Sequence, residues 1–252
     1  SNIECWRNIQ CWNNVGHNNI MNNIPTIYED DDIIVVNKPA GLEVREVALA
    51  LRSSRGEAGA QLELAHRLDR DTSGILLLAK HERAHEYLKQ LFQERKIKKT
   101  YIALVEGLMK EKEGTIDLPI GRSPHHPSRR VAFKKIDGKK REAVTIWRVK
   151  KYFPQQPRLT RRDQYTLLEV MPQTGRTHQI RVHLKAIGHP VACDKLYFAK
   201  TCPDGLTRQF LHAYALEFIL PPASPSLGGS GGTIRLEAEL PRDLQNTLDA
   251  LS

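Results

Sequence analysis

Short apolar runs of strand length recur along the chain from residue 33 onward, and they constrain its fold more than any other feature. Runs of this kind, bounded by turn residues, are typical of buried strands. We predict strands at residues 33–36, 74–79, 100–105, 143–149, 165–170, 215–220 and 234–238. Helical spacing of apolar residues occurs at 82–93, 180–187 and 244–251. Strands therefore outnumber helices and do not alternate regularly with them.

This order of elements favours an α+β fold with a mixed, largely antiparallel central sheet and flanking helices and loops. A doubly wound nucleotide-binding fold requires regular alternation, which is missing here. The sequence also has no Walker-type loop and no G-x-G-x-x-G motif, so we expect no nucleotide cofactor. Gly188 follows the helix expected at 180–187 and is predicted to end it.

The first 24 residues differ in composition from the rest of the chain. Eight of the first 23 are asparagine, and the segment has little periodicity. Polar tracts of this kind do not bury enough apolar surface to fold alone. We therefore predict an Asn-rich N-terminal arm at residues 1–24, flexible or non-native, and one folded domain at 25–252.

The charge of the chain points to a polyanionic partner. Lysine and arginine number 38 against 29 acids, a formal charge of +9, and neutralising phosphates releases counterions. No run approaches the ~18 apolar residues of a membrane span, and the first residues do not resemble a secretory signal. The four cysteines lack C-x-x-C spacing and are too sparse for a secreted disulfide framework. We expect reduced thiols in a cytoplasmic protein.

The polar segment HRLDRDTSG at residues 66–74 leads directly into an apolar strand. Active sites are usually built at such edges of a rigid scaffold. Asp69 lies between Arg67 and Arg70, whose charges favour its ionised form. An ion-paired loop without a catalytic role explains the same composition, and the residues alone leave both interpretations open.

A second polar cluster, TGRTHQIRVHL at residues 174–184, opens the helix expected near 180–187. Thr177 is the predicted N-cap, and Arg181 lies about one turn further along. His178 and His183 are five residues apart and do not share a helical face. We expect them to form hydrogen bonds or pack, not to bind a metal. Tyr101, in the strand at 100–105, packs in the sheet unless a site uses it.

Residues 122–141 concentrate positive charge. Eight lysines and arginines stand against one acid, Asp137, and Asp137-Gly138 is a hairpin signal. The segment is therefore predicted to form a basic ribbon. Like charges held this close cost energy unless a polyanion meets them, which favours RNA contact over a merely solvated loop. Arg129 and Arg130 are the candidate contacts.

These elements, in this order, resemble the RluA-type family of RNA pseudouridine synthases. The resemblance runs from about residue 27 to 251. It rests on YEDDDIIVVNKPAGL at 28–42, HRLDRDTSGILLLAK at 66–80, KKTYIALVEG at 98–107, TGRTHQIRVHL at 174–184, GHPVACDKLY at 188–197 and LHAYALEF at 211–218. It implies the pseudouridine synthase fold and an enzyme that isomerises specific uridines in rRNA or tRNA to pseudouridine.

Three features depart from the family pattern. Residues 43–45 are Glu-Val-Arg where members often have a histidine-containing turn, and Cys193 stands where many members have glycine. Residues 1–24 are too short and too polar to fold as the small RNA-binding domain that some members carry. We therefore expect target selection to depend on the catalytic domain or on the arm.

The resemblance also implies roles for individual residues. Asp69 is the essential carboxylate, which either attacks the ribose or abstracts its 2′ proton. Tyr101 stacks on the base and helps to remove the proton from carbon 5. Arg181 pairs with Asp69 and keeps it ionised and oriented, and Arg67 occupies the space left by the flipped uridine. The expected RNA-binding residues are Arg67, Arg129, Arg130, Arg176 and His178.

An isomerisation of this kind requires no redox step and no energy input, so we expect neither a metal nor a cofactor. We expect a monomer whose partner is RNA, without membrane association. A catalytically silent RNA-binding protein is disfavoured by the intact Asp69, Tyr101 and Arg181. A nucleoside glycosidase with Asp69 and Asp71 as paired carboxylates is weaker, because their arginine neighbours suit a single anion. Tritium release from carbon 5 of labelled uridine distinguishes the three.

Overall fold

The computed structural model describes residues 24–56, 61–123, 126, 128–132, 140–153, 164–197, 199–220 and 232–252. Its strands are β1 (Thr26–Glu29), β2 (Ile33–Lys38), β3 (Glu63–Leu64), β4 (Ser73–Ala79), β5 (Lys98–Glu106), β6 (Glu113–Asp117), β7 (Ile120–Arg122), β8 (Arg130–Ala132), β9 (Val144–Phe153), β10 (Tyr165–Pro172), β11 (Leu211–Ile219) and β12 (Thr233–Glu237). Its helices are α2 (Val44–Arg55), α3 (Glu82–Gln93), α4 (Gln179–Ala186) and α5 (Arg242–Leu251), with a 3₁₀ turn at Lys195–Tyr197. The predicted N-terminal arm lies outside the described residues except for Ile24.

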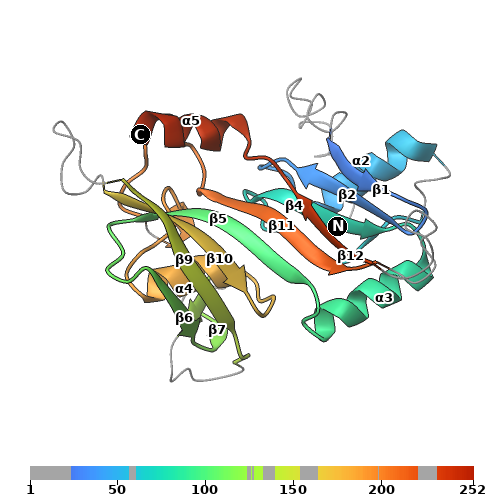
Figure 1. Ribbon diagram of the computed structural model, residues 1–252, viewed down its shortest axis with the longest axis horizontal. Coiled ribbons are helices and arrows are strands. Elements are labelled where there is room, and N and C mark those ends of the chain that lie inside the picture. Colours follow the sequence, from blue (N-terminus) through green and yellow to red (C-terminus); the bar gives the residue numbers. More distant parts are fainter. Residues whose placement is uncertain are drawn as a thin grey trace, which may run out of the picture.

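A single ten-stranded sheet forms the centre of the fold. Its order is β1-β2-β4-β11-β5-β10-β9-β6, with β12 paired to β11 and β3 paired to β4. Neighbouring strands are antiparallel except β4 and β11, which are parallel. Figure 1 shows the sheet running across the molecule, with α2 and α3 toward one end and α4 toward the other. The predicted α+β class with a mixed, largely antiparallel sheet is confirmed.

The β2–β4 half of the sheet is buried on both faces. Val35 belongs to a cluster with Leu88 of α3, whereas its neighbour Val36 packs in a cluster with Val47 of α2. Successive side chains of a strand point to opposite faces, so each helix covers one face. This double cover explains why residues 33–36 form an unbroken apolar run.

The other half of the sheet is covered in the same way by α4 and α5. On β5, Val105 packs in a cluster with Leu184 of α4, and the adjacent Leu104 packs with Leu244 of α5. Both strand residues are fully buried. The alternation along β5 therefore directs Tyr101 to the same face as Val105, which is the face of α4.

The two halves of the sheet join where β4 lies parallel to β11. Ser73 pairs with His212 and Gly74 with Ala213. Gly74 has φ +115°, and a Cβ atom there would collide with the backbone of Ala213. A glycine at this position is therefore required for the close approach of the two strands. Because Asp69 lies just before β4, this junction fixes the loop that carries it.

Several local features differ from the sequence-based expectation. The N-cap of α4 is His178, in a left-handed conformation with φ 57°, so the prediction of Thr177 was wrong. Helix α2 was not predicted, because its buried side consists of only Val47, Ala48 and Leu51 among polar residues. Gly188 follows α4 with φ +89°, as predicted.

Cys193 and Cys202 form a disulfide, so the expectation of reduced thiols is wrong for this pair. They are separated by 9 positions, but the intervening turn folds the chain back and brings their Cα atoms to 4.5 Å. Cys193 also has φ 61°, a conformation that favours glycine, which is the residue that many relatives were expected to have here. No helix in the described part of the chain is long and apolar enough to cross a membrane.

Candidate active site

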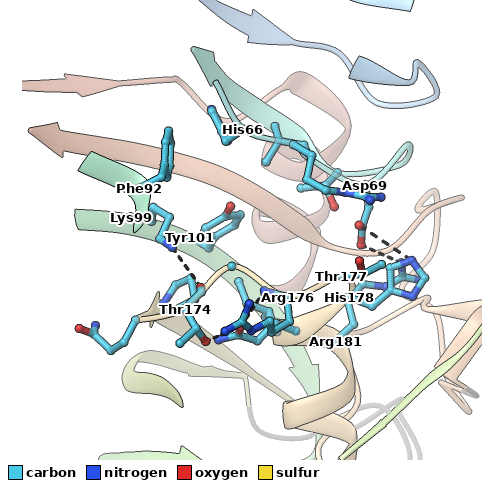
Figure 2. Close-up of a pocket in the computed structure, with 18 of the residues that line it drawn as sticks. His66, Asp69, Phe92, Lys99, Tyr101, Thr174, Arg176, Thr177, His178 and Arg181 are labelled. Carbon is cyan, nitrogen blue, oxygen red and sulfur yellow. Dashed lines mark hydrogen bonds and ion pairs between the residues drawn. The ribbon is translucent and has the colours of Figure 1, made fainter. Parts of the chain in front are cut away.

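A cavity of about 530 Å³ opens beside the junction of the two sheet halves, a size typical of small-ligand sites. Its walls come from the segment before β4, the end of α3, the start of β5 and the segment that leads into α4. Asp69, Tyr101 and Arg181 all line it. Figure 2 shows the three side chains around this cavity. The structure thus brings together the three residues for which the family resemblance implies a catalytic role.

Asp69 and Arg181 form an ion pair across this cavity. Nη1 of Arg181 donates to Oδ2 of Asp69 at 3.0 Å, and the side chains of Arg181 and Asp69 are 8% and 15% exposed, respectively. Burial alone would lower the pKa of Arg181, but hydrogen bonds and charge from Asp194, followed by Asp69, raise it above its ordinary value. The guanidinium is therefore always charged, and the carboxylate faces a permanent cation.

The loop that carries Asp69 is held by a buried lysine from β2. Nζ of Lys38 donates to the carbonyl oxygens of Pro39, Leu42 and Arg70 at 2.8, 2.8 and 2.9 Å. Burial lowers the pKa of Lys38 to about 8, while three acceptors match the three donors of an ammonium group. Lys38 therefore ties the turn after β2 to the residue that follows Asp69.

Tyr101 and Lys99 project from the same face of β5 into the cavity. Burial, together with the charge of Asp69, raises the pKa of Tyr101 above its ordinary value, so its phenol is protonated at neutral pH. Nζ of Lys99 donates to the carbonyl of Thr174 at 3.0 Å, and burial and neighbouring Arg176 lower the pKa of Lys99 to about 8. The sequence analysis did not identify Lys99 as a site residue. Its spacing of two residues from Tyr101 could have indicated that both side chains lie on the same face of the strand.

His178 lies beside Asp69. Its Nε2 is 3.9 Å from Oδ1 of Asp69, and its Nδ1 shares a hydrogen bond of 3.0 Å with the hydroxyl of Tyr197. Burial lowers the pKa of His178 despite the opposing charge of Asp69, which favours a neutral imidazole at pH 7. His178 therefore lies within the site as a polar neighbour of the carboxylate.

His183 belongs to the interior of the fold. Its two ring nitrogens form hydrogen bonds of 2.9 Å with Oγ1 of Thr145 and with the carbonyl of Leu118. This agrees with the expectation of a hydrogen-bonding histidine. Among the residues that the structure describes, no group of three or more His, Cys, Asp and Glu side chains is placed to hold a metal ion.

The cavity is strongly basic. Among the described residues that line it, Asp69 is the one acid, and the cations are Arg67, Lys89, Arg95, Lys99, Arg176 and Arg181. A second cavity, of about 1010 Å³, lies on the other side of the Asp69 loop and shares Arg67, Asp69, His178 and Arg181 with the first. Its acids and cations are nearly balanced, so the first cavity is the better site for an anionic ligand.

The predicted basic ribbon is described in part. Strands β7 and β8 form a two-stranded sheet in which Arg122 lies opposite Arg130, and like charges in this position repel each other. Arg129 lines the second cavity, and the backbone N–H of Arg130 donates to the hydroxyl of Tyr197 at 3.0 Å. The hairpin signal at Asp137-Gly138 lies outside the described residues.

A basic cavity with an ion-paired carboxylate and an aromatic ring in its wall is suited to an enzyme that acts on a nucleotide. The comparisons with known proteins give the class: the family model for RNA pseudouridylate synthase matches residues 32–186. The chain belongs to this family and is an RNA pseudouridine synthase, an isomerase.

Curated relatives and solved structures agree. The chain is 37% identical over 242 residues to ribosomal large subunit pseudouridine synthase C of Salmonella typhi, covering 89% of this chain and 69% of that protein. It is 37% identical over 243 residues to ribosomal large subunit pseudouridine synthase D of Nitrosomonas europaea, covering 89% and 64%, respectively. Human RNA pseudouridylate synthase domain containing 4 matches with a TM-score of 0.68 at 25% identity, over 94% of this chain and 95% of that chain. The expected pseudouridine synthase fold is confirmed.

Proposed function

We propose that this enzyme converts specific uridines of ribosomal RNA to pseudouridine, with Asp69 as the essential carboxylate. The observation that carries the proposal is the position of Asp69, which lines the basic cavity and is held by Arg181 at 3.0 Å. Two relatives at 37% identity are named as synthases of the ribosomal large subunit, which favours ribosomal RNA over transfer RNA. Transfer RNA is the alternative that the assay below compares.

The arrangement of Asp69 and Tyr101 around the basic cavity suits an isomerisation within a single nucleotide. A uridine turned out of its helix enters the cavity, with its base against Tyr101 and its ribose at Asp69. Asp69 attacks the anomeric carbon or removes the 2′ proton, and uracil leaves with the bonding electrons on nitrogen 1. The base then turns, and carbon 5 bonds to the anomeric carbon. This step breaks the ester bond to Asp69 in the first case, and in the second case Asp69 returns the proton to carbon 2′. Carbon 5 loses its proton and nitrogen 1 gains one, so the product is an isomer of the substrate.

The surrounding cations support binding of the flipped nucleotide and its flanking phosphates. Arg67 is exposed and lines both cavities, a position that suits the space vacated by the uridine. Arg176 and Lys99 lie in the wall of the basic cavity, where uracil carries negative charge after the bond breaks. In this proposal Arg129, which lines the second cavity, and its neighbour Arg130 contact the RNA backbone.

The whole of residues 25–252 acts as the catalytic domain in this proposal. Support comes from the ten-stranded sheet, whose strands extend from Thr26 to Glu237 along the chain, and from helix α5, which packs on this sheet through Leu244. In this proposal the enzyme works as a monomer in the cytoplasm and needs no metal or nucleotide cofactor. Activity that disappears on exhaustive chelation and returns with a metal would contradict the last point.

Tritium release is the direct test. Ribosomal and transfer RNA transcripts labelled at carbon 5 of uridine are incubated with the wild type, with Asp69→Asn and with Asp71→Asn. We expect release from ribosomal RNA by the wild type and by the exposed Asp71→Asn control, and none by Asp69→Asn, which should still bind RNA. Turnover by Asp69→Asn would refute the role of Asp69. Release of free uracil would instead indicate a glycosidase.

A further inference from the structure

The turn from Cys193 to Cys202 is closed by the disulfide between these two residues. Cys193 is 5% exposed, lies in the wall of the second cavity and directly follows Ala192, whose N–H donates to the carbonyl of Leu104 on β5 at 2.8 Å. Cys202, in contrast, is exposed. One end of the disulfide is therefore anchored to the central sheet, and the other is open to attack by a soluble thiol.

The backbone of Cys193 is in an unfavourable conformation. Its φ of 61° lies in the left-handed region, which glycine adopts readily and a residue with a Cβ atom adopts only at a cost in free energy. The disulfide adds a covalent constraint that holds the turn in this shape. Reduction removes the constraint, so relaxation of Cys193 would move the turn that it begins.

The surroundings of the two sulfur atoms suit the reduced form as well. Sγ of Cys193 and Sγ of Cys202 lie 3.3 and 2.8 Å from the carbonyl oxygen of Leu206. A carbonyl oxygen has two lone pairs, so it accepts a hydrogen bond from each S–H group once the disulfide is reduced. Both thiols therefore have a partner, and reduction leaves no unsatisfied donor at this position.

The same turn reaches the active site through Tyr197, which is 4% exposed. The hydroxyl of Tyr197 shares a hydrogen bond of 3.0 Å with Nδ1 of His178 and accepts one of 3.0 Å from the backbone N–H of Arg130 on β8. Its ring centroid is 5.2 Å from the guanidinium carbon of Arg181. Movement of the turn would therefore displace Tyr197 from three groups that lie around Asp69 and along the basic ribbon.

We propose that Cys193 and Cys202 form a reversible thiol–disulfide site that controls the turn carrying Tyr197. The oxidised enzyme is the more active form, because the disulfide holds Tyr197 against His178 and β8. Reduction loosens the turn and lowers turnover. The effect on turnover rests on the proposed function, whereas the reversible bond and its effect on the stability of the turn do not.

A dithiol is the reductant in this proposal. One of its thiolates attacks Sγ of the exposed Cys202, the S–S bond breaks, and Cys193 leaves as a thiolate that takes up a proton. The second thiol of the reductant then displaces Cys202 as a thiol, and the reductant becomes a cyclic disulfide. Two electrons and two protons thus pass to the protein. Oxidised glutathione reverses the reaction through a mixed disulfide on Cys202, and two molecules of reduced glutathione are released.

The test uses the full chain with Cys5 and Cys11 replaced by serine, so that Cys193 and Cys202 are its remaining cysteines. Thiols are counted after denaturation, in samples reduced with dithiothreitol or oxidised with glutathione disulfide. We expect no thiols after oxidation and both after reduction. The reduced form should have a Tm at least about 4 °C lower and a kcat/KM for tritium release about tenfold lower, and reoxidation should restore both.

Three results would overturn the proposal. The first is a pair that stays reduced in excess glutathione disulfide, and the second is a disulfide that dithiothreitol leaves intact in the folded protein. The third is a kcat/KM that agrees within about threefold between the two forms.

Two variants separate the disulfide from the backbone conformation. Cys202→Ser lacks the bond but retains the strained Cys193, so it should match the reduced enzyme under both conditions. Cys193→Gly also lacks the bond, but glycine adopts a φ of 61° without strain. Its kcat/KM should therefore stay within about threefold of the oxidised enzyme and should not respond to dithiothreitol. A Cys202→Ser variant as active as the oxidised enzyme, or a Cys193→Gly variant as slow as the reduced one, would contradict this account.

The readouts also distinguish this inference from the proposed function. A protein that releases no tritium from ribosomal or transfer RNA in either form would refute the proposed function. The thiol count and the Tm would then decide whether the pair is reversible and holds the turn. An equal Tm in the oxidised and reduced forms would overturn the inference without any activity measurement.

Discussion

Arg181→Met removes the one cation that two partly or fully buried carboxylates share. Methionine retains the aliphatic bulk of arginine but leaves Asp69 and Asp194 without this partner. Loss of the pairing with Asp69 alone, whose side chain is 15% exposed, predicts a modest loss of stability. The structure implies more, because Asp194 is 1% exposed and cannot be hydrated in place of its missing hydrogen bonds.

The size of the loss in stability follows from the burial of Arg181 and its two carboxylate partners, Asp69 and Asp194. Removing one partner of a buried ion pair costs about 3–5 kcal/mol. For a chain of this size about 1 kcal/mol corresponds to 2–4 °C, so the Tm of Arg181→Met should fall by roughly 6–20 °C. Turnover should fall by orders of magnitude, because Asp69 loses its orientation. Thermal unfolding and tritium release from carbon 5, measured below the lowered Tm, check the two effects separately.

A double variant tests the reasoning independently of the single one. Arg181→Met combined with Asp194→Asn removes the more deeply buried of the two uncompensated charges, and the amide oxygen still accepts the backbone hydrogen bonds of Leu196 and Tyr197. Much of the decrease in Tm should be reversed, while turnover stays as low as in the single variant. A single variant that loses less than about 1 kcal/mol, or that turns over within tenfold of the wild type, would refute this account of the site.

Three further outcomes are expected. Neutralising Arg129 and Arg130 together should reduce the slope of log affinity against log salt by about 0.7–0.9 for each phosphate whose neutralisation is abolished. Gly74→Ala should destabilise the protein by at least about 2–3 kcal/mol in urea unfolding, because its φ of +115° and the backbone of Ala213 both exclude a methyl group. Burial lowers the pKa of His212 to about 4, so the contribution of His212 to folding stability is fully present above pH 6.5 and should fall by about 2 kcal/mol between pH 7 and pH 5.

Each of these outcomes has a control. An unchanged slope of log affinity against log salt would indicate that the basic ribbon is a solvated loop that does not contact RNA. Gly188→Ala changes a glycine with φ +89° and no neighbour within 4 Å of its Cβ, so it separates backbone strain from the collision at Gly74. His212→Gln should reduce the pH dependence by about 2 kcal/mol and leave the part due to His66, whose pKa burial lowers to about 3. An unchanged pH dependence in this variant would contradict the contribution of His212.

The sequence determined the class of the fold and the identity of the chemical groups. The apolar runs became strands because a run without polar interruption must be buried on both faces, as Val35 and Val36 are. The segment 66–74 likewise marked Asp69, since a dense polar motif before a buried strand is a local property of the chain. Local pattern was insufficient for α2, whose buried side is too narrow to give a clear signal.

Only the tertiary structure decided how the groups act on one another. Asp69 and Arg181 are 112 positions apart, and their 3.0 Å contact arises from the sheet order that places β5 between β11 and β10. The disulfide between Cys193 and Cys202, the burial of Asp194 and the entry of Lys99 into the cavity have the same origin. Burial and distance depend on contacts between remote segments, and residue types in one stretch of chain do not specify those contacts. The sequence therefore supplied the carboxylate, and the fold supplied the environment that controls it.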